Sequence, residues 1–255
     1  MVDIPKELTH TGHHPRMAVV WSVLSAEIER FAAGTGATLR ILDVGGGSGG
    51  FAVPLAELGH DVTVVEPSAN ALASLRQRAA DAGVTDRVRA VQADADELPD
   101  VAEPGTADLV LCHSVLEMVD YPDIALDALR RVCAPGGGVS ILVANRIAAV
   151  LGKALAGNFP AALDLLTHVD GVIAARDTIK RRFETATLTA LVGGSGLVTE
   201  QVHGVGVVGD LLPAAAAKGE AGTDALREFE LATAARVPFR DMATHIHLLA
   251  RKPMR

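Results

Sequence analysis

The sequence predicts an α/β fold, a doubly wound and mostly parallel sheet of seven strands with helical inserts. Short segments rich in Val and Leu alternate with helical patterns over the first 145 residues, and such repeats imply parallel strands with right-handed crossovers. The first of these strands runs into the glycine-rich segment ILDVGGGSGG at 41–50, which is typical of a ligand-binding turn between a strand and a helix. The length of 255 residues fits a single domain, 1–255, with an insertion or two.

The core of the predicted domain, residues 39–145, holds five strands and the helices that connect them. The strands are expected at 39–44, 61–66, 87–92, 107–113 and 139–144. The helices are expected at 49–58, 68–82 and 122–132. Gly59 should end the first helix in a left-handed conformation, and Ser68 should cap the start of the second. The segment PGGG at 135–138 should close the third.

The segments outside this core are mostly helical. Residues 1–38 form an N-terminal helical segment with an amphipathic stretch from about Arg16 to Phe31. Two inserts, 146–182 and 210–240, predict further helices and are expected to form a lid over the ligand crevice. A helix at 187–192 and strands at 197–208 and 244–251 complete the pattern, and the last pair should add an antiparallel edge strand.

Composition and charge argue against several classes of function. The formal net charge of −8 does not favour neutralising phosphates, so a broad RNA or DNA footprint is not expected. The one run of three basic residues, KRR at 180–182, is interpreted as a solvated helix face. Cys112 and Cys133 are too few for a disulfide framework, and the nine histidines show no HExxH pattern, so no metal is expected. Without a secretory signal or an apolar run that could span a bilayer, a cytoplasmic protein with no membrane partner is expected.

Two ligands compete for the glycine loop. Gly45, Gly47 and Gly50 satisfy the G-x-G-x-x-G spacing of dinucleotide sites, which by itself is a weak signal. Asp43 lies two residues before the first glycine, where its carboxylate would repel a diphosphate and attract a cation or a hydroxyl or amine donor. S-adenosylmethionine carries an ammonium and a sulfonium and has no phosphate. We therefore expect S-adenosylmethionine as the cofactor.

A family resemblance supports this choice of ligand. The pattern D-x-G-x-G-x-G, formed by Asp43, Gly45, Gly47 and Gly49 with Gly46 inside it, resembles motif I of class I methyltransferases. The segment VLEMVDYPDIALDALRRVCAPGGGVSILVAN at 115–145 is similar to the methyltransferase type 11 group. The resemblance implies a Rossmann-like fold and methyl transfer from S-adenosylmethionine.

The remaining cofactor residues are expected at the carboxyl ends of the next strands. Glu66 ends the second strand, where a carboxylate can accept hydrogen bonds from both ribose hydroxyls, and Pro67 follows it. Asp94 follows the third strand and is a candidate acceptor for the adenine amino group, with the backbone of Ala93 or Ala95 beside the ring. Asp96 and Glu97 compete with Asp94 for that role.

His113, at the end of the fourth strand, is the candidate catalytic residue. In methyltransferases the loop after this strand lines the methyl-donating end of the cofactor. His113 is either a base or a hydrogen-bonded wall there, and we favour the wall because methyl transfer often needs no base.

A narrower resemblance rests on three short blocks and covers most of the chain. The blocks RMAVVW at 16–21, AVLGKALAGNF at 149–159 and IHLLARKP at 246–253 are similar to the tRNA 5-carboxymethoxyuridine methyltransferase family. That family esterifies a carboxylate on a tRNA wobble uridine. The resemblance implies that Arg16 reaches the cofactor carboxylate and that Asn145 faces the acceptor.

The chemistry of the acceptor is left open between alternatives. A carboxylate is already ionised and needs only a cation to hold it; the candidates are Arg146, Lys153, Arg181 and Arg240. An amine or phenol would need a base such as His113 or His168. A small-molecule O- or N-methyltransferase of secondary metabolism is therefore a second hypothesis, favoured by the low basicity and apolar inserts. A non-catalytic cofactor-binding partner subunit is a third.

Overall fold

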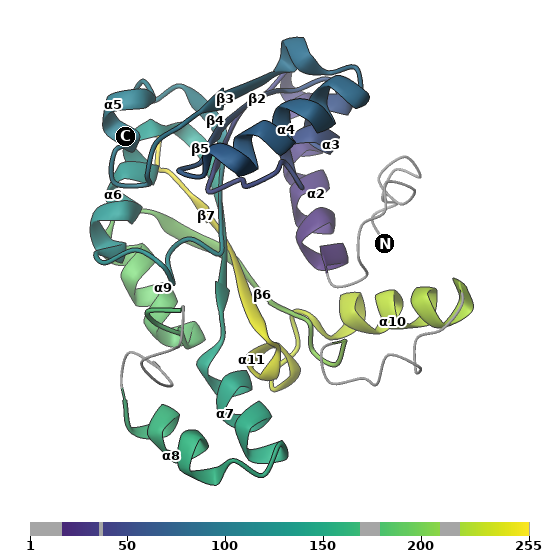
Figure 1. Ribbon diagram of the computed structural model, residues 1–255, viewed down its shortest axis with the longest axis vertical. Coiled ribbons are helices and arrows are strands. Elements are labelled where there is room, and N and C mark those ends of the chain that lie inside the picture. Colours follow the sequence, from purple (N-terminus) through teal and green to yellow (C-terminus); the bar gives the residue numbers. More distant parts are fainter. Residues whose placement is uncertain (1–16, 36–37, 169–178, 210–219, 255) are drawn as a thin grey trace.

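A seven-stranded sheet forms the centre of the molecule, in the order β3-β2-β1-β4-β5-β7-β6 (Figure 1). The structure is a computed structural model that describes residues 17–35, 38–168, 179–209 and 220–254. The strands are β1 Arg40–Val44, β2 Asp61–Val65, β3 Val88–Val91, β4 Ala107–His113, β5 Cys133–Ala144, β6 Val198–Val205 and β7 His245–Arg251. The pairings among β1 to β5 are parallel, and β7 pairs antiparallel with both β5 and β6. The predicted α/β fold with a mostly parallel seven-stranded sheet is confirmed.

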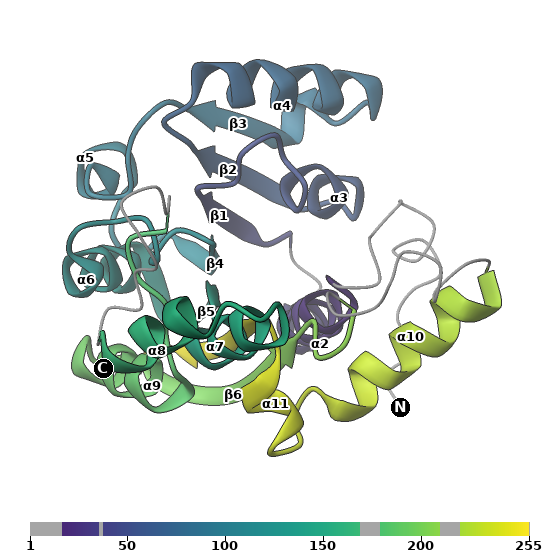
Figure 2. The same ribbon diagram turned by 60° about the horizontal axis from the view of Figure 1, so that its bottom comes forward.

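The helices cover both faces of this sheet. They are α2 Ala18–Thr35, α3 Ala52–Glu57, α4 Ala69–Asp81, α5 Leu98–Val101, α6 Pro122–Val132, α7 Arg146–Leu155, α8 Phe159–Thr167, α9 Thr185–Gly194, α10 Glu220–Thr233 and α11 Phe239–Met242. Figure 2 shows α3 and α4 on one side of the strands and α5 and α6 on the other. This doubly wound arrangement buries the central parallel strands on both faces, which is why β1 and β4 are rich in Val, Ile and Leu.

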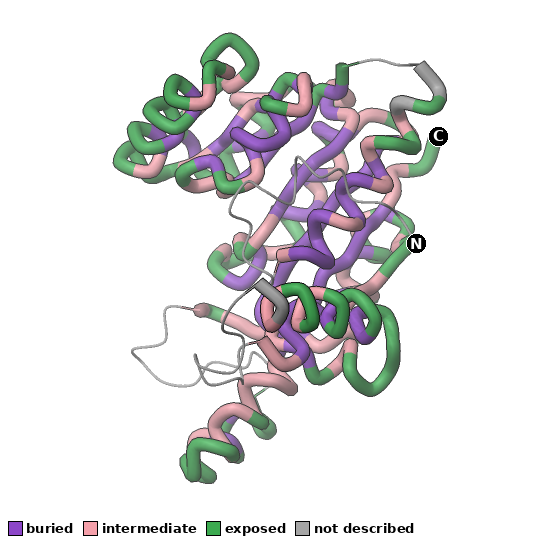
Figure 3. Tube along the Cα trace, turned by 90° about the vertical axis from the view of Figure 1, so that its right-hand side faces the viewer, coloured by how far each residue is buried: buried purple, intermediate pink, exposed green. Residues whose placement is uncertain are grey.

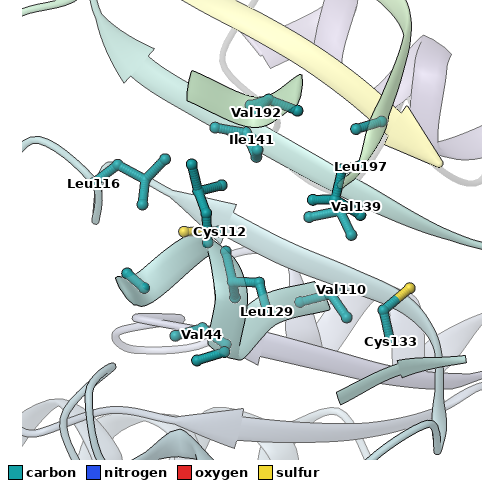
Figure 4. Packing of buried hydrophobic residues seen from close by; sticks show 14 of the residues in the cluster. Val44, Val110, Cys112, Leu116, Leu129, Cys133, Val139, Ile141, Val192 and Leu197 are labelled. Carbon is teal, nitrogen blue, oxygen red and sulfur yellow. The ribbon is translucent and has the colours of Figure 1, made fainter. Parts of the chain in front are cut away.

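Each face has its own hydrophobic core. One core packs β4 and β5 against α6 and α9, and it includes Cys112, Leu129, Ile141 and Val192 (Figure 4). The other packs the opposite face against α2, α3 and α4, with Trp21 stacked on Phe51 at a centroid distance of 5.0 Å. The central strands β1, β4, β5 and β7 are mostly buried, whereas the outer helices expose one side (Figure 3). Both thiols, of Cys112 and Cys133, are free and buried, and burial raises their pKa.

Two predicted caps are present in the structure. Gly59 ends α3 with a φ of +93°, in the left-handed region that glycine tolerates. The Ser68 hydroxyl accepts a hydrogen bond from the Ala71 amide at the start of α4.

Three details differ from the sequence prediction. Residues 135–138 do not end a helix but belong to β5. A Cβ at Gly137 would collide with Cys133 and Ala134 of the same strand, and one at Gly138 with Glu27 of α2. The antiparallel strand β7 lies one place in from the edge, which is formed by β6. The KRR segment at 180–182 is not helical but an extended connection before α9.

Both inserts leave the sheet at the edge that carries the glycine loop. The helices α7 and α8 follow β5, and α10 follows β6, which runs in the same direction as β5 (Figure 1). The buried Glu230 of α10 accepts hydrogen bonds from the amides of Val207, Val208 and Gly209 and so fixes this helix to the end of β6. The role of the inserts as a lid stays a prediction. Within the described ranges, no helix combines the length and apolarity needed to cross a membrane.

An ion-pair cluster joins the helix α2 to the far edge of the sheet. Glu27 of α2 is 3 % exposed and accepts hydrogen bonds from Arg30 and from Arg251 of β7, which also pairs with Glu200 of β6. Burial alone would raise the pKa of Glu27, but the hydrogen bonds from Arg251 and Arg30 outweigh it and lower the pKa.

We predict that Glu27→Gln lowers the free energy of unfolding at pH 7 by about 2 kcal/mol. The substitution leaves the half-buried guanidinium of Arg251 without the negative charge of Glu27. Since the folded-state pKa of Glu27 is lowered, its contribution is complete above pH 4.5 and is lost as the pH falls through the folded pKa. Urea unfolding at pH 7 and pH 3 measures both. The control Asp61→Asn breaks an exposed pair with Arg87 and should cost less than about 1 kcal/mol. An equal loss at both pH values would contradict the electrostatic explanation.

Candidate functional site

The candidate site lies at the carboxyl ends of β1, β2 and β4, where the strand order reverses. Successive strands run outward from β1 to β3 on one side and from β4 on the other, which creates the crevice where ligands bind in such sheets. The glycine loop follows β1 directly. Alternate glycines of the D-x-G-x-G-x-G pattern, Gly45, Gly47 and Gly49, have φ of +71°, +55° and +83°. The spacing therefore reflects a backbone that bulkier residues adopt only with strain.

The surroundings of these glycines separate their roles. A Cβ at Gly45 would collide with Val115, and one at Gly49 with Leu75, so both positions are closed by packing. At Gly47 a Cβ would meet no protein atom within 4 Å. Gly47 thus borders open space in the protein on the side where a side chain would project.

Asp43 is a buried carboxyl group beneath the loop. Its side chain is 2 % exposed, and its Oδ2 has no hydrogen-bond partner in the protein. Burial, with a smaller contribution from the negative charge of Glu66, raises the pKa of Asp43 to about 7. A Cβ at Gly46 would lie 2.6 Å from the Asp43 carboxyl carbon and 2.9 Å from Val64. Gly46 therefore leaves room for an unsatisfied carboxylate that a cationic group could neutralise.

Glu66 joins the end of β2 to the glycine loop. Its carboxylate accepts hydrogen bonds from the Gly47 amide at 3.1 Å and from the Ser68 amide at 2.9 Å. Each carboxylate oxygen can accept further bonds, so two ligand hydroxyls can still be bound. Glu66 is half-buried, at the boundary between the loop and solvent.

A cavity of about 620 Å³ opens beside these residues. Five predicted cofactor residues line it: Gly45, Glu66, Pro67, Asp94 and Ala95. The opposite wall comes from the loop after β4 and the start of α6, including Val115, Met118 and Tyr121. A second hollow of about 610 Å³ lies near the amino ends of β1 to β3, around Arg40 and Arg89, and none of the predicted site residues lines it.

His113 is held in the neutral form. Its Nε2 lies 2.9 Å from the Ser140 hydroxyl, which in turn lies 2.8 Å from Nε2 of the buried His247. Its ring packs edge-on against Phe51 at 4.7 Å between centroids. Burial lowers the pKa of His113 to about 3, so it is a poor proton acceptor at neutral pH. This arrangement disfavours a general base. His113 is not among the residues that line the cavity, so its role as a wall stays a prediction.

Asn145 has a structural role at the start of α7. It is 2 % exposed, and its Oδ1 caps α7 by accepting from the Ile147 amide. Its Nδ2 donates to the carbonyls of Asp241 and Ala243. Both ends of the amide are used inside the protein, which disfavours an acceptor contact; that contact stays a prediction. Arg16 lies outside the described residues.

Most of the cations proposed to hold an acceptor are paired within the protein. Arg146 forms an ion pair with Glu184, and Arg240 with Asp241. The Arg181 guanidinium donates to the carbonyls of Val119 and Asp120. Lys153 is at the end of α7 and does not line the cavity. His168 is exposed at the end of α8, with Nδ1 beside the Asp164 carbonyl.

Sequence reasoning missed Glu117, a second buried acid at this edge. It is 3 % exposed, its Oε2 has no partner, and burial raises its pKa to about 7 despite hydrogen bonds from Ser114 and the backbone. Its neighbour Ser114 has a φ of +58°, an uncommon conformation for a residue other than glycine. An acidic residue inside the apolar run VLEMV was the available signal. In the described part of the chain, no group of three or more His, Cys, Asp or Glu side chains could hold a metal.

We predict that Gly46→Ala destabilises the protein, because the added methyl group collides with Asp43 and Val64. The expected loss is about 1–3 kcal/mol in the free energy of unfolding. Gly50→Ala is the matched control, since its Cβ would meet nothing within 4 Å, and it should change stability by less than about 0.5 kcal/mol. Equal Tm shifts for the two variants would refute this description of the loop.

Comparison with known proteins assigns the site to a family. Residues 42–141 match the family model described as a methyltransferase domain. The tRNA 5-carboxymethoxyuridine methyltransferase of Escherichia coli K12 is 30 % identical over 246 residues, covering 93 % of this chain and 88 % of that protein. A ubiquinone biosynthesis O-methyltransferase of Chelativorans is 31 % identical over 66 % of this chain and 62 % of its own length.

Solved structures agree on the fold. The magnesium protoporphyrin IX methyltransferase of Synechocystis, solved with bound S-adenosylhomocysteine (SAH), superposes with a TM-score of 0.59 at 14 % identity. The match covers 99 % of this chain and 89 % of that one. The buried acid and alternating glycines after β1, together with these similarities, lead to one conclusion: the chain belongs to the class I S-adenosylmethionine-dependent methyltransferases, in the family that includes the tRNA 5-carboxymethoxyuridine methyltransferase.

Proposed function

We propose that this methyltransferase esterifies a carboxylate acceptor, with 5-carboxymethoxyuridine in tRNA as that acceptor and the cytoplasm as its location. The observation that carries the proposal is the 30 % identity to the tRNA enzyme over 93 % of the chain, since it extends through both inserts and beyond the cofactor core.

The cofactor fits the residues at the edge of the sheet. In this proposal the open face of Gly47 takes the amino-acid end, and the unpartnered carboxylate of Asp43 offsets its positive charge. Glu66 accepts from the ribose hydroxyls beside Pro67, and Asp94 and Ala95 lie along the adenine. Arg16 would reach the cofactor carboxylate. When bound, the cofactor supplies an electrophilic methyl group on its sulfonium.

The chain's own residues then align the acceptor and exclude water. A carboxylate oxygen of the acceptor forms a bond to the methyl carbon as the carbon–sulfur bond breaks, and no proton moves. This chemistry needs no general base, and the low pKa of His113 makes it a poor base at pH 7. In this proposal His113, held by Ser140, keeps the role of a hydrogen-bonded wall.

A second candidate is a small-molecule acceptor with the same cofactor site. The cavity wall carries four acids, Glu66, Asp94, Asp96 and Asp120, and the chain has a net charge of −8. Such a surface disfavours a polyphosphate chain. The similarity to ubiquinone biosynthesis O-methyltransferases is compatible with this candidate.

The stability of the product in alkali distinguishes the two candidates. The enzyme is incubated with radiolabelled S-adenosylmethionine and, in parallel, tRNA bearing 5-carboxymethoxyuridine or a metabolite extract. We expect labelled tRNA that releases labelled methanol in mild alkali, because methyl esters hydrolyse while N-methyl groups and methyl ethers resist. A label that survives alkali would refute the ester. Labelled metabolites with unlabelled tRNA would show that the acceptor is a small molecule and not tRNA.

We also predict that Asp43→Asn lowers the affinity for the cofactor and raises the stability of the fold at high pH. The affinity for SAH should fall about tenfold or more, because a charge-assisted contact is lost. Because the folded-state pKa of Asp43 is raised to about 7, wild-type stability falls as the pH rises from about 4 to 7, and Asn removes this loss. At pH 8 the variant should be more stable by about 1–2 kcal/mol. Calorimetry and denaturant unfolding test both, and unchanged affinity would exclude the assigned contact.

A further inference from the structure

A four-residue strap, residues 180–183, crosses the carboxyl edge of the sheet beside the cavity. The amides of Lys180 and Arg181 donate to the Glu117 carbonyl at 2.9 and 3.3 Å, which ties the strap to the loop after β4. The amide of Phe183 donates to the Ala144 carbonyl at 2.9 Å, which ties it to the end of β5. Phe183 is 4 % exposed, so the strap is anchored in the core at this end.

The strap brings one basic side chain to the cavity. Lys180 is the single basic residue among the described residues that line it. The neighbouring Arg181 is occupied by the carbonyls of Val119 and Asp120, and Arg182 acts on the charge of the buried Glu117. Only the first residue of the KRR run therefore has its charged group at the site.

The ammonium of Lys180 is held by a partner that a ligand can replace. Its Nζ lies 2.6 Å from Oδ1 of Asp120, and the two side chains are 47 % and 71 % exposed. Ion pairs this exposed contribute little to stability. A ligand carboxylate can therefore replace Asp120 as the partner of Lys180 at a small cost in free energy. Asp120 thus positions the ammonium at the rim of the cavity, and the ion pair can open when a ligand carboxylate binds.

The charge of the cavity makes this lysine important for an anionic acceptor. The lining acids Glu66, Asp94, Asp96 and Asp120 would repel a second carboxylate. A cofactor with positive charge is favoured by the same acids. The acceptor needs a local cation, and Lys180 is the one that the described lining offers.

We infer that Lys180 is the residue that binds the carboxylate of the acceptor, with Asp120 holding its ammonium ready when the acceptor is absent. This inference rests on the proposed function, in which the acceptor bears a carboxylate. It assigns to one residue the role that sequence reasoning left among several cations.

The test compares variants of Lys180 in the full-length enzyme with tRNA bearing 5-carboxymethoxyuridine as the acceptor. Lys180→Ala should raise the KM for this acceptor about 10- to 100-fold, the range for a charge-assisted hydrogen bond. Its Kd for SAH should stay within about twofold of wild type, since the cofactor is already held by the glycine loop. Lys180→Arg should keep most of the affinity. Asp120→Asn should keep or lower the KM, because it frees the ammonium.

Lys153→Ala is the control, because Lys153 belongs to the same insert but does not line the cavity. It should leave the acceptor KM unchanged, and Tm values show that each variant is folded. An unchanged KM in Lys180→Ala, or a loss confined to the Kd for SAH, would overturn the assignment of Lys180.

The failure of the function and the failure of the residue are distinguishable. If the wild-type product resists mild alkali, the carboxylate function is wrong, and the inference falls with it. If the product is a base-labile ester and Lys180→Ala forms it with wild-type KM, only the assignment of Lys180 is wrong.

Discussion

The burial of Asp43 beneath the glycine loop is the constraint on which the site depends. The carboxyl group is fixed at the end of the central strand β1, with one oxygen unpaired and a raised pKa. It leaves room for no side chain at Gly46, and Glu66 adds negative charge nearby while holding the Gly47 amide. In the proposed function a cationic ligand would offset this buried charge, so the feature that is unfavourable for the fold would favour cofactor binding.

The acceptor side is organised around the loop after β4. Glu117 and Ser114 shape this loop from within, and the Glu117 carbonyl receives the strap that enters from the insert. The insert is thus connected to the cofactor cavity through backbone hydrogen bonds, which do not depend on which acceptor binds. On the opposite face of the sheet, His113, Ser140 and His247 form a buried polar line across β4, β5 and β7. Burial lowers the pKa of His113, so this line offers no ready base to the site.

The sequence by itself determined most of the elements and the strand ends that meet at the cavity. The bounds of β4 and α6 agree with the prediction, because a buried parallel strand and an amphipathic helix after Pro122 have strong local signals. The D-x-G-x-G-x-G spacing is equally local, since Gly45, Gly47 and Gly49 are the positions that take left-handed backbone angles. Residues at successive strand ends meet in space by topology alone, which is why Glu66, Pro67, Asp94 and Ala95 line one cavity with Gly45.

Only the tertiary structure decided which candidate acceptor-side residues are already paired within the protein, because these pairs join residues far apart in the chain. Nothing in the local sequence shows that the side chain of Asn145 is already bonded. It caps α7 and also donates to the carbonyls of Asp241 and Ala243, which lie 96 and 98 residues away in the chain. Among the basic residues of the inserts, sequence could not separate Lys180 from Arg146, Arg181 and Arg240; the latter three are paired by Glu184, two carbonyls and Asp241. The segment 135–138 continues β5, where Gly138 is paired with Leu109 of β4 and Arg251 of β7, partners that are distant in the sequence. Local patterns specify which residues can bind, whereas long-range pairing decides which of them remain available.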